Sequence, residues 1–131
     1  MNEKMSLLEL NNRIRDALQG AFPETLWVVA EISEIKVNRT GHCYLELVEK
    51  DDVTDELTAR ARATIWSYTF RMLRPYFETT TGQPLAEGIK ILVQVSVEYH
   101  PGYGLSLNIK DIDPTYTLGD LALRRREIIR R

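Results

Sequence analysis

The sequence WVVAEISEIKVNRTGHCYLELVEK occupies residues 27–50, and LTARARATIW follows at residues 57–66. Apolar and polar residues alternate along both stretches, which is typical of β-strands with one buried face. The turn-forming residues NRTG separate the first two runs. These runs predict the front of a small β-barrel. The expected strands are residues 25–37, 42–49 and 58–66.

The side chains predicted to face the barrel interior are smallest in the third of these strands. In the first strand, Val28, Ala30 and Ile32 alternate with Trp27, Val29 and Glu31, so both faces are partly apolar at its start. This suits a strand that bends around a barrel, with Ala30 as the bend point. The alanines of the third strand suit the tight interior of a narrow barrel. The inward residues expected from the second and third strands are Cys43, Leu45, Leu47, Ala59, Ala61, Ala63 and Ile65.

Two further strands are predicted at residues 89–99 and 105–113, joined by the glycine-containing turn His100–Gly104. Between the third and fourth strands, Ser67 is expected to cap a short helix that bends or stops near Pro75. The inner side of that helix carries Phe70, Leu73 and Phe77.

A helix is also predicted at each end of the chain. Residues 6–20 have an apolar face that we expect to pack against the barrel, with Ser6 and Glu9 as a capping box and Gly20 as the stop. A second helix is expected to start at Thr117, and it contains no stop signal before the sequence ends.

The order of elements is helix, three strands, helix, two strands and the start of a helix. Five short strands with a helix between the third and fourth predict a mainly β fold, the OB-fold, which is a five-stranded Greek-key barrel. We expect residues 1–116 to form this domain. Residues 117–131 would begin a helix that leads to a part of the protein beyond this sequence.

Charge and composition limit the functions that this chain can have. The 131 residues carry a net charge of −2, but RRREIIRR at 124–131 holds five Arg and one Glu, so the remainder carries −6. An acidic body argues against indiscriminate binding of polyanions, so a nucleic acid would need a local basic patch. A single cysteine, Cys43, and the absence of a signal sequence or long apolar run favour a cytoplasmic protein with no membrane segment.

Such barrels bind ligands across strands two and three, between the loops that join strands one to two and four to five. Aromatic rings there can stack on bases, and Arg or Lys can pair with phosphates, so the pattern predicts binding of a single nucleic-acid strand. The candidate contacts are Lys36, Arg39, His42, Tyr44, Arg60, Arg62, Trp66, His100 and Tyr103.

Structural roles for the same residues stay open at this point. Tyr44 and Trp66 could cover the barrel edge, and the two histidines could be turn residues. Arg60 and Arg62 could pair with the acids of Glu49–Glu56, which we interpret as a solvated loop. Glu46 lies in the same outward row and would repel phosphate.

The residues form no recognisable catalytic or metal-binding pattern. The sequence has no phosphate-binding glycine loop, no HExxH and no GxSxG. His42 and Cys43 are strand neighbours and point to opposite faces, so they cannot ligate one zinc ion. We therefore expect no catalytic residue, metal or cofactor within this chain.

The chain resembles the N-terminal domain of the exodeoxyribonuclease VII large subunit. The similar blocks are SLLELNNRIRDAL, WVVAEISEIKVNRTGHCYLELVEK, RARATIW, ILVQVSVEYHPGYGLSLNIKDIDP and LGDLAL, in that order. The resemblance implies an OB-fold that binds DNA ahead of a separate catalytic domain. It also implies a parent hydrolase with small subunits, which degrades single-stranded DNA to oligonucleotides.

At matching positions, the resemblance supports only the groove residues Lys36, Arg39, His42, Tyr44, Arg62, Trp66 and Tyr103 as DNA contacts. It places the catalytic residues outside this chain, so this domain would bind and guide the strand. The alternative is an OB module that docks a protein or another subunit, because interface anchors also use Trp, Tyr and Arg.

Overall fold

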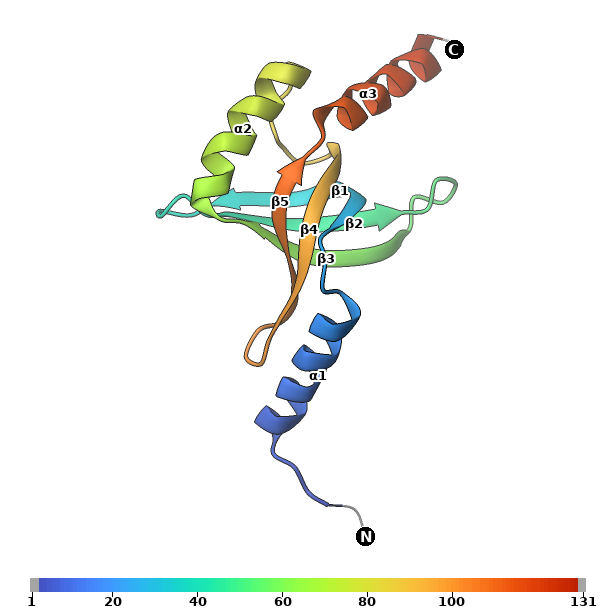
Figure 1. Cartoon of the computed structure of the whole chain (residues 1–131). Helices are drawn as coiled ribbons and strands as arrows, with labels where there is room; N and C mark the ends of the chain where they lie inside the picture. The colour runs from blue at the N-terminus through green and yellow to red at the C-terminus, as the bar shows by residue number, and fades with distance from the viewer. Residues whose placement is uncertain (1–2, 130–131) are drawn as a thin grey trace.

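Five strands close into a barrel in the computed structural model, which describes residues 3–129 and the side chains of residues 3–126. Their order around the barrel is β1-β2-β3-β5-β4, and β4 pairs with β1 to close the sheet. The β3–β5 pairing is parallel and the others are antiparallel. This arrangement, shown in Figure 1, confirms the predicted OB-fold. The strands are β1 (Leu26–Val37), β2 (Cys43–Lys50), β3 (Leu57–Ile65), β4 (Lys90–His100) and β5 (Gly104–Ile112).

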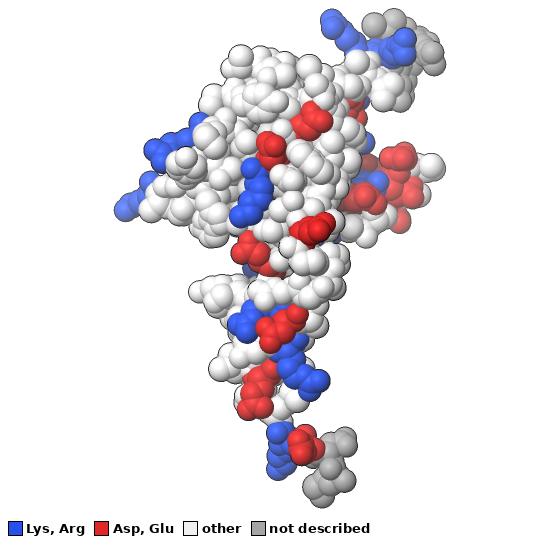
Figure 2. Space-filling model, in the orientation of Figure 1, with Lys and Arg blue, Asp and Glu red and all other residues white. Residues whose placement is uncertain are grey.

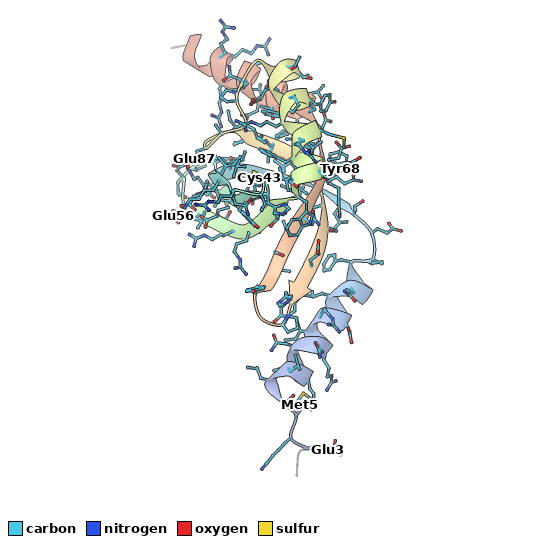
Figure 3. The ribbon with its side chains drawn as sticks, turned by 90° about the vertical axis from the view of Figure 1, so that its left-hand side faces the viewer. Glu3, Met5, Cys43, Glu56, Tyr68 and Glu87 are labelled. Atoms are coloured by element: carbon cyan, nitrogen blue, oxygen red, sulfur yellow. The ribbon has the colours of Figure 1, made fainter. Side chains whose placement is uncertain are left out.

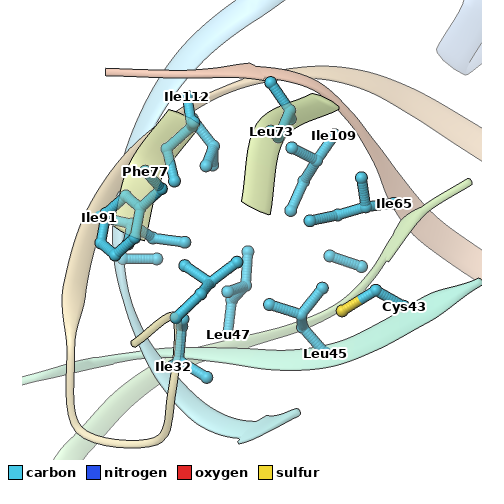
Figure 4. Close-up of a cluster of buried hydrophobic side chains, with 14 of the residues drawn as sticks. Ile32, Cys43, Leu45, Leu47, Ile65, Leu73, Phe77, Ile91, Ile109 and Ile112 are labelled. Atoms are coloured by element: carbon cyan, nitrogen blue, oxygen red, sulfur yellow. The ribbon is translucent and has the colours of Figure 1, made fainter. Parts of the chain in front are cut away.

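Aliphatic side chains from all five strands fill the barrel interior, because alternate residues of each strand point inward. Ala59 is an exception, since it is exposed although the alternation predicts it inside. The β3–β5 pairing is confined to Ala63 and Thr64, so the first half of β3 extends beyond the closed part of the barrel. The core residues labelled in Figure 4 are Ile32, Cys43, Leu45, Leu47, Ile65, Leu73, Phe77, Ile91, Ile109 and Ile112.

The first strand changes partner half-way along its length. Its early residues pair with β4 and its later residues pair with β2. The irregularity in the β1–β2 register lies between Ile32 and Glu34, and not at Ala30 as predicted. A bulge of this kind bends a strand and increases its twist, which lets β1 serve two neighbours of the barrel.

The helix α2 (Ser67–Thr81) covers one end of the barrel (Figure 1). Phe70, Leu73 and Phe77 are buried, as predicted. The helix nevertheless continues through Pro75 and ends at Thr81, followed by the cap residue Gly82, whose φ of 67° is left-handed. Burial of side chains before and after the proline holds the two halves in one helix, so of the two predicted alternatives, a bend or a stop, the stop is wrong.

The start of α2 also differs from its prediction. Ser67 is the first helical residue, and the preceding cap residue, Trp66, makes no side-chain capping bond. The backbone N–H of Ser67 donates instead to Nδ1 of His42 at 3.0 Å. A helix N-terminus has backbone donors without internal partners, so His42 performs the capping that was predicted for Ser67.

The helix α1 (Leu7–Ala21) projects away from the barrel (Figure 1). The predicted capping bond is confirmed, because the backbone N–H of Glu9 donates to Oγ of Ser6 at 3.1 Å. The helix passes through Gly20 and ends at Ala21, so the predicted stop at the glycine is wrong.

The predicted packing of the apolar face of α1 is wrong as well. Leu7, Leu10 and Ile14 are exposed, and the helix has no buried residue. Its tie to the barrel is polar, since the Tyr99 hydroxyl donates to Oδ1 of Asn11 at 2.7 Å. The contact with β4 therefore uses the edge of the apolar face and leaves its centre open to solvent.

The helix α3 (Pro114–Ile129) starts three residues earlier than predicted. Proline is favoured in the first turn of a helix, and Oδ1 of Asp113 accepts from the backbone N–H of Thr115 at 3.0 Å. Thr117 is buried, and its hydroxyl donates to the carbonyl oxygen of Lys90 at 2.7 Å. The last two arginines of the predicted helix lie outside the described residues, and the division after residue 116 stays a prediction.

A search of the described helices finds none with the length and apolar character needed to cross a membrane.

Candidate nucleic-acid interface

A groove of about 750 Å³ runs over the outer side of β2 and β3 and reaches the β4–β5 hairpin. Six of the nine predicted contact residues line it, and they come from four strands and two connecting segments. The fold therefore brings together residues that are far apart in the sequence: Lys36 and Tyr103 are 67 positions apart. The six are Lys36, Tyr44, Arg62, Trp66, His100 and Tyr103.

Strand pairing places three of these side chains, Lys36, Tyr44 and Arg62, in two neighbouring rows. Lys36 of β1 lies opposite Tyr44 of β2, which lies opposite Thr64 of β3. The next row, two residues along each strand, holds Glu34, Glu46 and Arg62. Residues two apart on a strand share a face, so the six side chains of these two rows lie on the outer surface of one curved sheet.

Three aromatic rings in the groove are accessible to a ligand. Tyr44 is 42% exposed, Trp66 is 44% exposed and Tyr103 is 75% exposed. An accessible ring on a rigid strand or turn can stack on a base at little entropic cost. The prediction that Tyr44 and Trp66 share one wall with Arg62 agrees with this geometry.

Arg62 joins β3 to the β4–β5 hairpin, because its guanidinium donates to the backbone oxygen of Tyr103. The hairpin is fixed further by stacking of the His100 and Tyr103 rings, whose centroids are 4.6 Å apart. Nδ1 of His100 accepts from the backbone N–H of Gly102 at 2.9 Å. These contacts hold Tyr103 in place at the rim of the groove.

His42 does not belong to the groove lining. Its ring meets Trp66 edge-on, with centroids 4.9 Å apart, and its Nδ1 accepts from the backbone N–H of Ser67. His42 therefore positions Trp66 and the start of α2.

Arg39 and Arg60 also lie outside the groove lining. Arg39 is exposed in the β1–β2 turn, which Asn38 stabilises by accepting from the backbone N–H groups of Thr40 and His42 at 3.1 and 2.9 Å. Nε of Arg60 is 3.6 Å from Oε1 of Glu46. Arg60 thus pairs with an acid on the neighbouring strand, and not with the acidic loop as one interpretation proposed.

Besides Glu46, which the sequence already placed in the outward row, four polar residues of the lining were not among the predicted contacts: Glu34, Glu98, Thr64 and Ser106. Glu34 has the same strand parity as Lys36, and Glu98 falls on the outward side of its own strand. Alternation alone could therefore have identified both acids. With Glu46, the groove contains three carboxylates against the two cations Lys36 and Arg62.

The opposite end of the β2–β3 ribbon is acidic. Residues 51–56 form the loop that joins β2 to β3. Its acids lie exposed at one side of the molecule, where Figure 2 shows acidic side chains gathered. Asp51 folds the loop by accepting from the backbone N–H groups of Val53 and Thr54 at 2.8 and 2.9 Å, and the bond from Thr54 is the largest cause of its lowered pKa. The described residues contain no group of three or more His, Cys, Asp or Glu that could hold a metal ion.

Burial changes the chemistry of the single thiol. Figure 3 shows Cys43 within the barrel, and desolvation there raises its pKa to about 11. The coulombic effect of Arg74 opposes this shift but is smaller. The thiolate is the reactive form of cysteine, so this residue belongs to the core and is protected from reaction.

Comparison with known protein families matches residues 5–113 to the OB-fold nucleic acid binding domain. The chain belongs to this family. The groove described above is thus a feature of an OB-fold nucleic-acid-binding domain.

Two curated relatives confirm the resemblance to exodeoxyribonuclease VII. The exodeoxyribonuclease 7 large subunit of Deinococcus radiodurans is 38% identical to this OB-fold domain over 125 residues, which are 92% of this chain and 29% of that protein. The large subunit of Stenotrophomonas maltophilia is 31% identical over 124 residues, which are 95% of this chain and 24% of that protein. The chain therefore spans less than a third of the length of these relatives.

Solved structures also align with this OB-fold domain. The mitochondrial single-stranded DNA binding protein of S. cerevisiae has a TM-score of 0.46 and 16% identity, over 70% of this chain and 92% of that chain. The N-terminal domain of PriB from Thermoanaerobacter tencongensis has a TM-score of 0.43 and 14% identity, over 70% of this chain and 94% of that chain.

Proposed function

We propose that this domain binds a single strand of DNA in the groove, as the OB domain of an exodeoxyribonuclease VII large subunit. The observation that supports this most directly is the convergence of three exposed aromatic rings and two cations on one concave surface. The family of nucleic-acid-binding OB-folds and the exodeoxyribonuclease relatives favour the same ligand.

In this proposal the bases stack on Tyr44, Trp66 and Tyr103, and the phosphates pair with Lys36 and Arg62. Stacking on an aromatic ring contributes roughly 1–3 kcal/mol per base and depends little on the base. Arg39 lies in the turn next to the groove and extends the phosphate track. His42, Arg60 and His100 act mainly by holding other groups in place.

The hydrolysis of DNA is assigned by this proposal to parts of the enzyme outside the 131 residues, and so is the binding of small subunits. The domain would hold and guide a strand toward those parts. We further propose that it works in the cytoplasm, where the buried thiol of Cys43 stays reduced.

Titration with a labelled oligonucleotide at two salt concentrations tests this function. We expect single strands to bind more tightly than duplex of the same sequence. Affinity should fall with salt, with a slope of about 0.7 for each phosphate neutralised. The purified domain should leave the oligonucleotide intact. Absence of binding at low salt, or release of shortened products, would contradict the proposal.

One observation favours a second candidate, which is docking of a protein segment. The groove holds three carboxylates and two cations, a balance that suits a polypeptide as well as a nucleic acid. In that case the aromatic residues are interface anchors. The two candidates differ in the titration, because a protein-docking groove would show neither affinity for oligonucleotides nor a steep dependence on salt.

A further inference from the structure

Three carboxylates lie among the aromatic rings of the groove, and they cannot bind phosphate. Glu34, Glu46 and Glu98 all contribute to the lining. A carboxylate accepts hydrogen bonds and repels other anions, so these side chains cannot take the phosphates that Lys36 and Arg62 are proposed to bind. In a single strand, the parts that donate hydrogen bonds are the edges of the bases.

Glu34 and Glu46 face each other directly across β1 and β2. Like charges at directly opposed positions destabilise an antiparallel pair, and a donor placed between them relieves this repulsion. Arg60 approaches Glu46 from one side at 3.6 Å. Within the described part of the chain, Glu34 takes part in no ion pair, so its oxygens are free to accept from a ligand.

The spacing between this pair and Tyr44 suits a base. Tyr44 is two residues from Glu46 on β2, which corresponds to about 7 Å along a strand. A base stacked on the Tyr44 ring can span that distance with its hydrogen-bonding edge. The ring and the two carboxylates therefore form one surface that can hold a base by its face and its edge.

The four bases differ in what they offer to a carboxylate. Guanine presents two adjacent donors on its Watson–Crick edge, N1–H and the N2 amino group, which match the two oxygens of one carboxylate. Adenine and cytosine present one amino group, and thymine presents a single ring N–H. Bidentate contacts of this kind are the strongest and most specific side-chain hydrogen bonds.

We propose that Glu34 and Glu46 read the edge of a base stacked on Tyr44, and that this groove prefers guanine to thymine in single-stranded DNA. The inference rests on the proposed function and adds a base preference to it. The stacking rings and cations supply the general affinity, and the two carboxylates supply the discrimination.

Three single strands of about twelve nucleotides test the preference, a length within the range that one OB-fold covers. The first alternates dG and dT, the second replaces each dG by deoxyinosine, and the third is all dT. Inosine lacks only the N2 amino group of guanine. We expect the guanine strand to bind about tenfold more tightly than the thymine strand, the effect of one good bidentate contact. The inosine strand should fall between them.

The variant Glu34→Gln tests whether the carboxylate causes the preference. Removing the charge should weaken the contact with guanine and also reduce repulsion of the backbone, so the ratio of the two affinities should approach one. Glu87→Gln is a matched control, because Glu87 is exposed and does not line the groove; its side chain is labelled in Figure 3. It should leave the ratio unchanged. If Glu34→Gln unfolds at a lower temperature than the control, Glu46→Gln supplies the same comparison.

The outcomes separate the two proposals. Equal affinity for all three strands would overturn the base preference while the proposed DNA binding stands. A ratio that is the same in the parent protein and in Glu34→Gln would show that the preference arises elsewhere, and would also overturn the inference. Binding to none of the strands would remove the proposed function itself.

Discussion

The two ends of the β2–β3 ribbon have opposite chemistry. At one end, Tyr44, Arg62 and Trp66 line a groove whose side chains are held by hydrogen bonds and ring contacts. At the other end, residues 51–56 form a loop of exposed acids in which Val53 is 92% exposed. Both ends belong to the same pair of strands, so the sheet alone does not determine where a ligand binds.

Distance and screening explain how the two ends can act independently. Lys50 is six positions after Tyr44 on β2, and this spacing corresponds to about 20 Å along a strand. The Debye length is about 8 Å at physiological salt, so the acidic loop is largely screened from the groove. The negative net charge of the chain is therefore a poor guide to the potential at the site, whereas the acids inside the groove act on a ligand directly.

The largest expected effect on oligonucleotide affinity comes from removing an aromatic ring of the groove. Trp66→Ala should weaken oligonucleotide binding by roughly 1–3 kcal/mol, because one stacking surface is lost. Tyr68→Ala is the control, since Tyr68 is an exposed aromatic residue of α2 outside the groove. Fluorescence anisotropy measures both affinities, with thermal unfolding as a check on the fold. Equal losses in the two variants would show that the groove is not the binding surface.

A smaller effect is expected from the cation that links the groove to the hairpin. Arg62→Ala should lower the slope of log affinity against log salt by about 0.7, because one phosphate contact is lost. It also frees the backbone oxygen of Tyr103, so some affinity should be lost at every salt concentration. Arg71→Ala, on the exposed side of α2, should change neither quantity. An unaltered slope would show that Arg62 contacts no phosphate and only holds the hairpin.

The sequence predicted this groove because alternation in strands is a strict geometric rule. Once the strands were placed, Tyr44, Arg62 and Trp66 had to share the outer face of one sheet. His42 has the parity of that face, but it lies just before β2, where the chain meets the first turn of α2. Its role as a helix cap depends on a contact between segments that are 25 residues apart. The alternation of residues along a strand cannot predict such a contact.

The helices were predicted less well, for a related physical reason. The apolar stripe of α1 predicted packing against the barrel, yet the tie from Asn11 to Tyr99 turns that stripe toward solvent. Pro75 is a local signal for a break, but burial on both sides of it outweighs the lost hydrogen bond. In both cases tertiary contacts overrode a pattern that is read from neighbouring residues alone.

The acidic end should influence binding only when salt is low. The double variant Asp52→Asn, Asp55→Asn should raise the affinity for oligo-dT a few-fold at about 0.01 M salt, where the Debye length is about 30 Å, and leave it unchanged at 0.15 M. Glu34→Gln, inside the groove, should raise the same affinity at both salt concentrations. Anisotropy titrations at the two salt concentrations measure this. A gain at 0.15 M in the loop variant would mean that the two ends are coupled.

The smallest effect concerns the stability of the acidic loop itself. The pKa of Asp51 is lowered from its ordinary value of 3.8, first by the hydrogen bond from the Thr54 backbone and then by that from Val53. A carboxyl with a depressed folded-state pKa stabilises the fold above its unfolded-state pKa, and that contribution is lost as pH falls through the folded-state value. Asp51→Ala should therefore lower the unfolding midpoint slightly at pH 7 and less at a pH well below 3.8.

Asp52→Ala is the control for this last comparison, because Asp52 lies in the same exposed turn and its side chain makes no hydrogen bond to the described residues. Denaturant melts at several pH values measure both variants. Neither variant should change oligonucleotide binding at physiological salt, since the loop is beyond the screening distance from the groove. If Asp51→Ala weakened binding there, the turn at the acidic end would be transmitting a change along β2 and β3, and the independence of the two ends would fail.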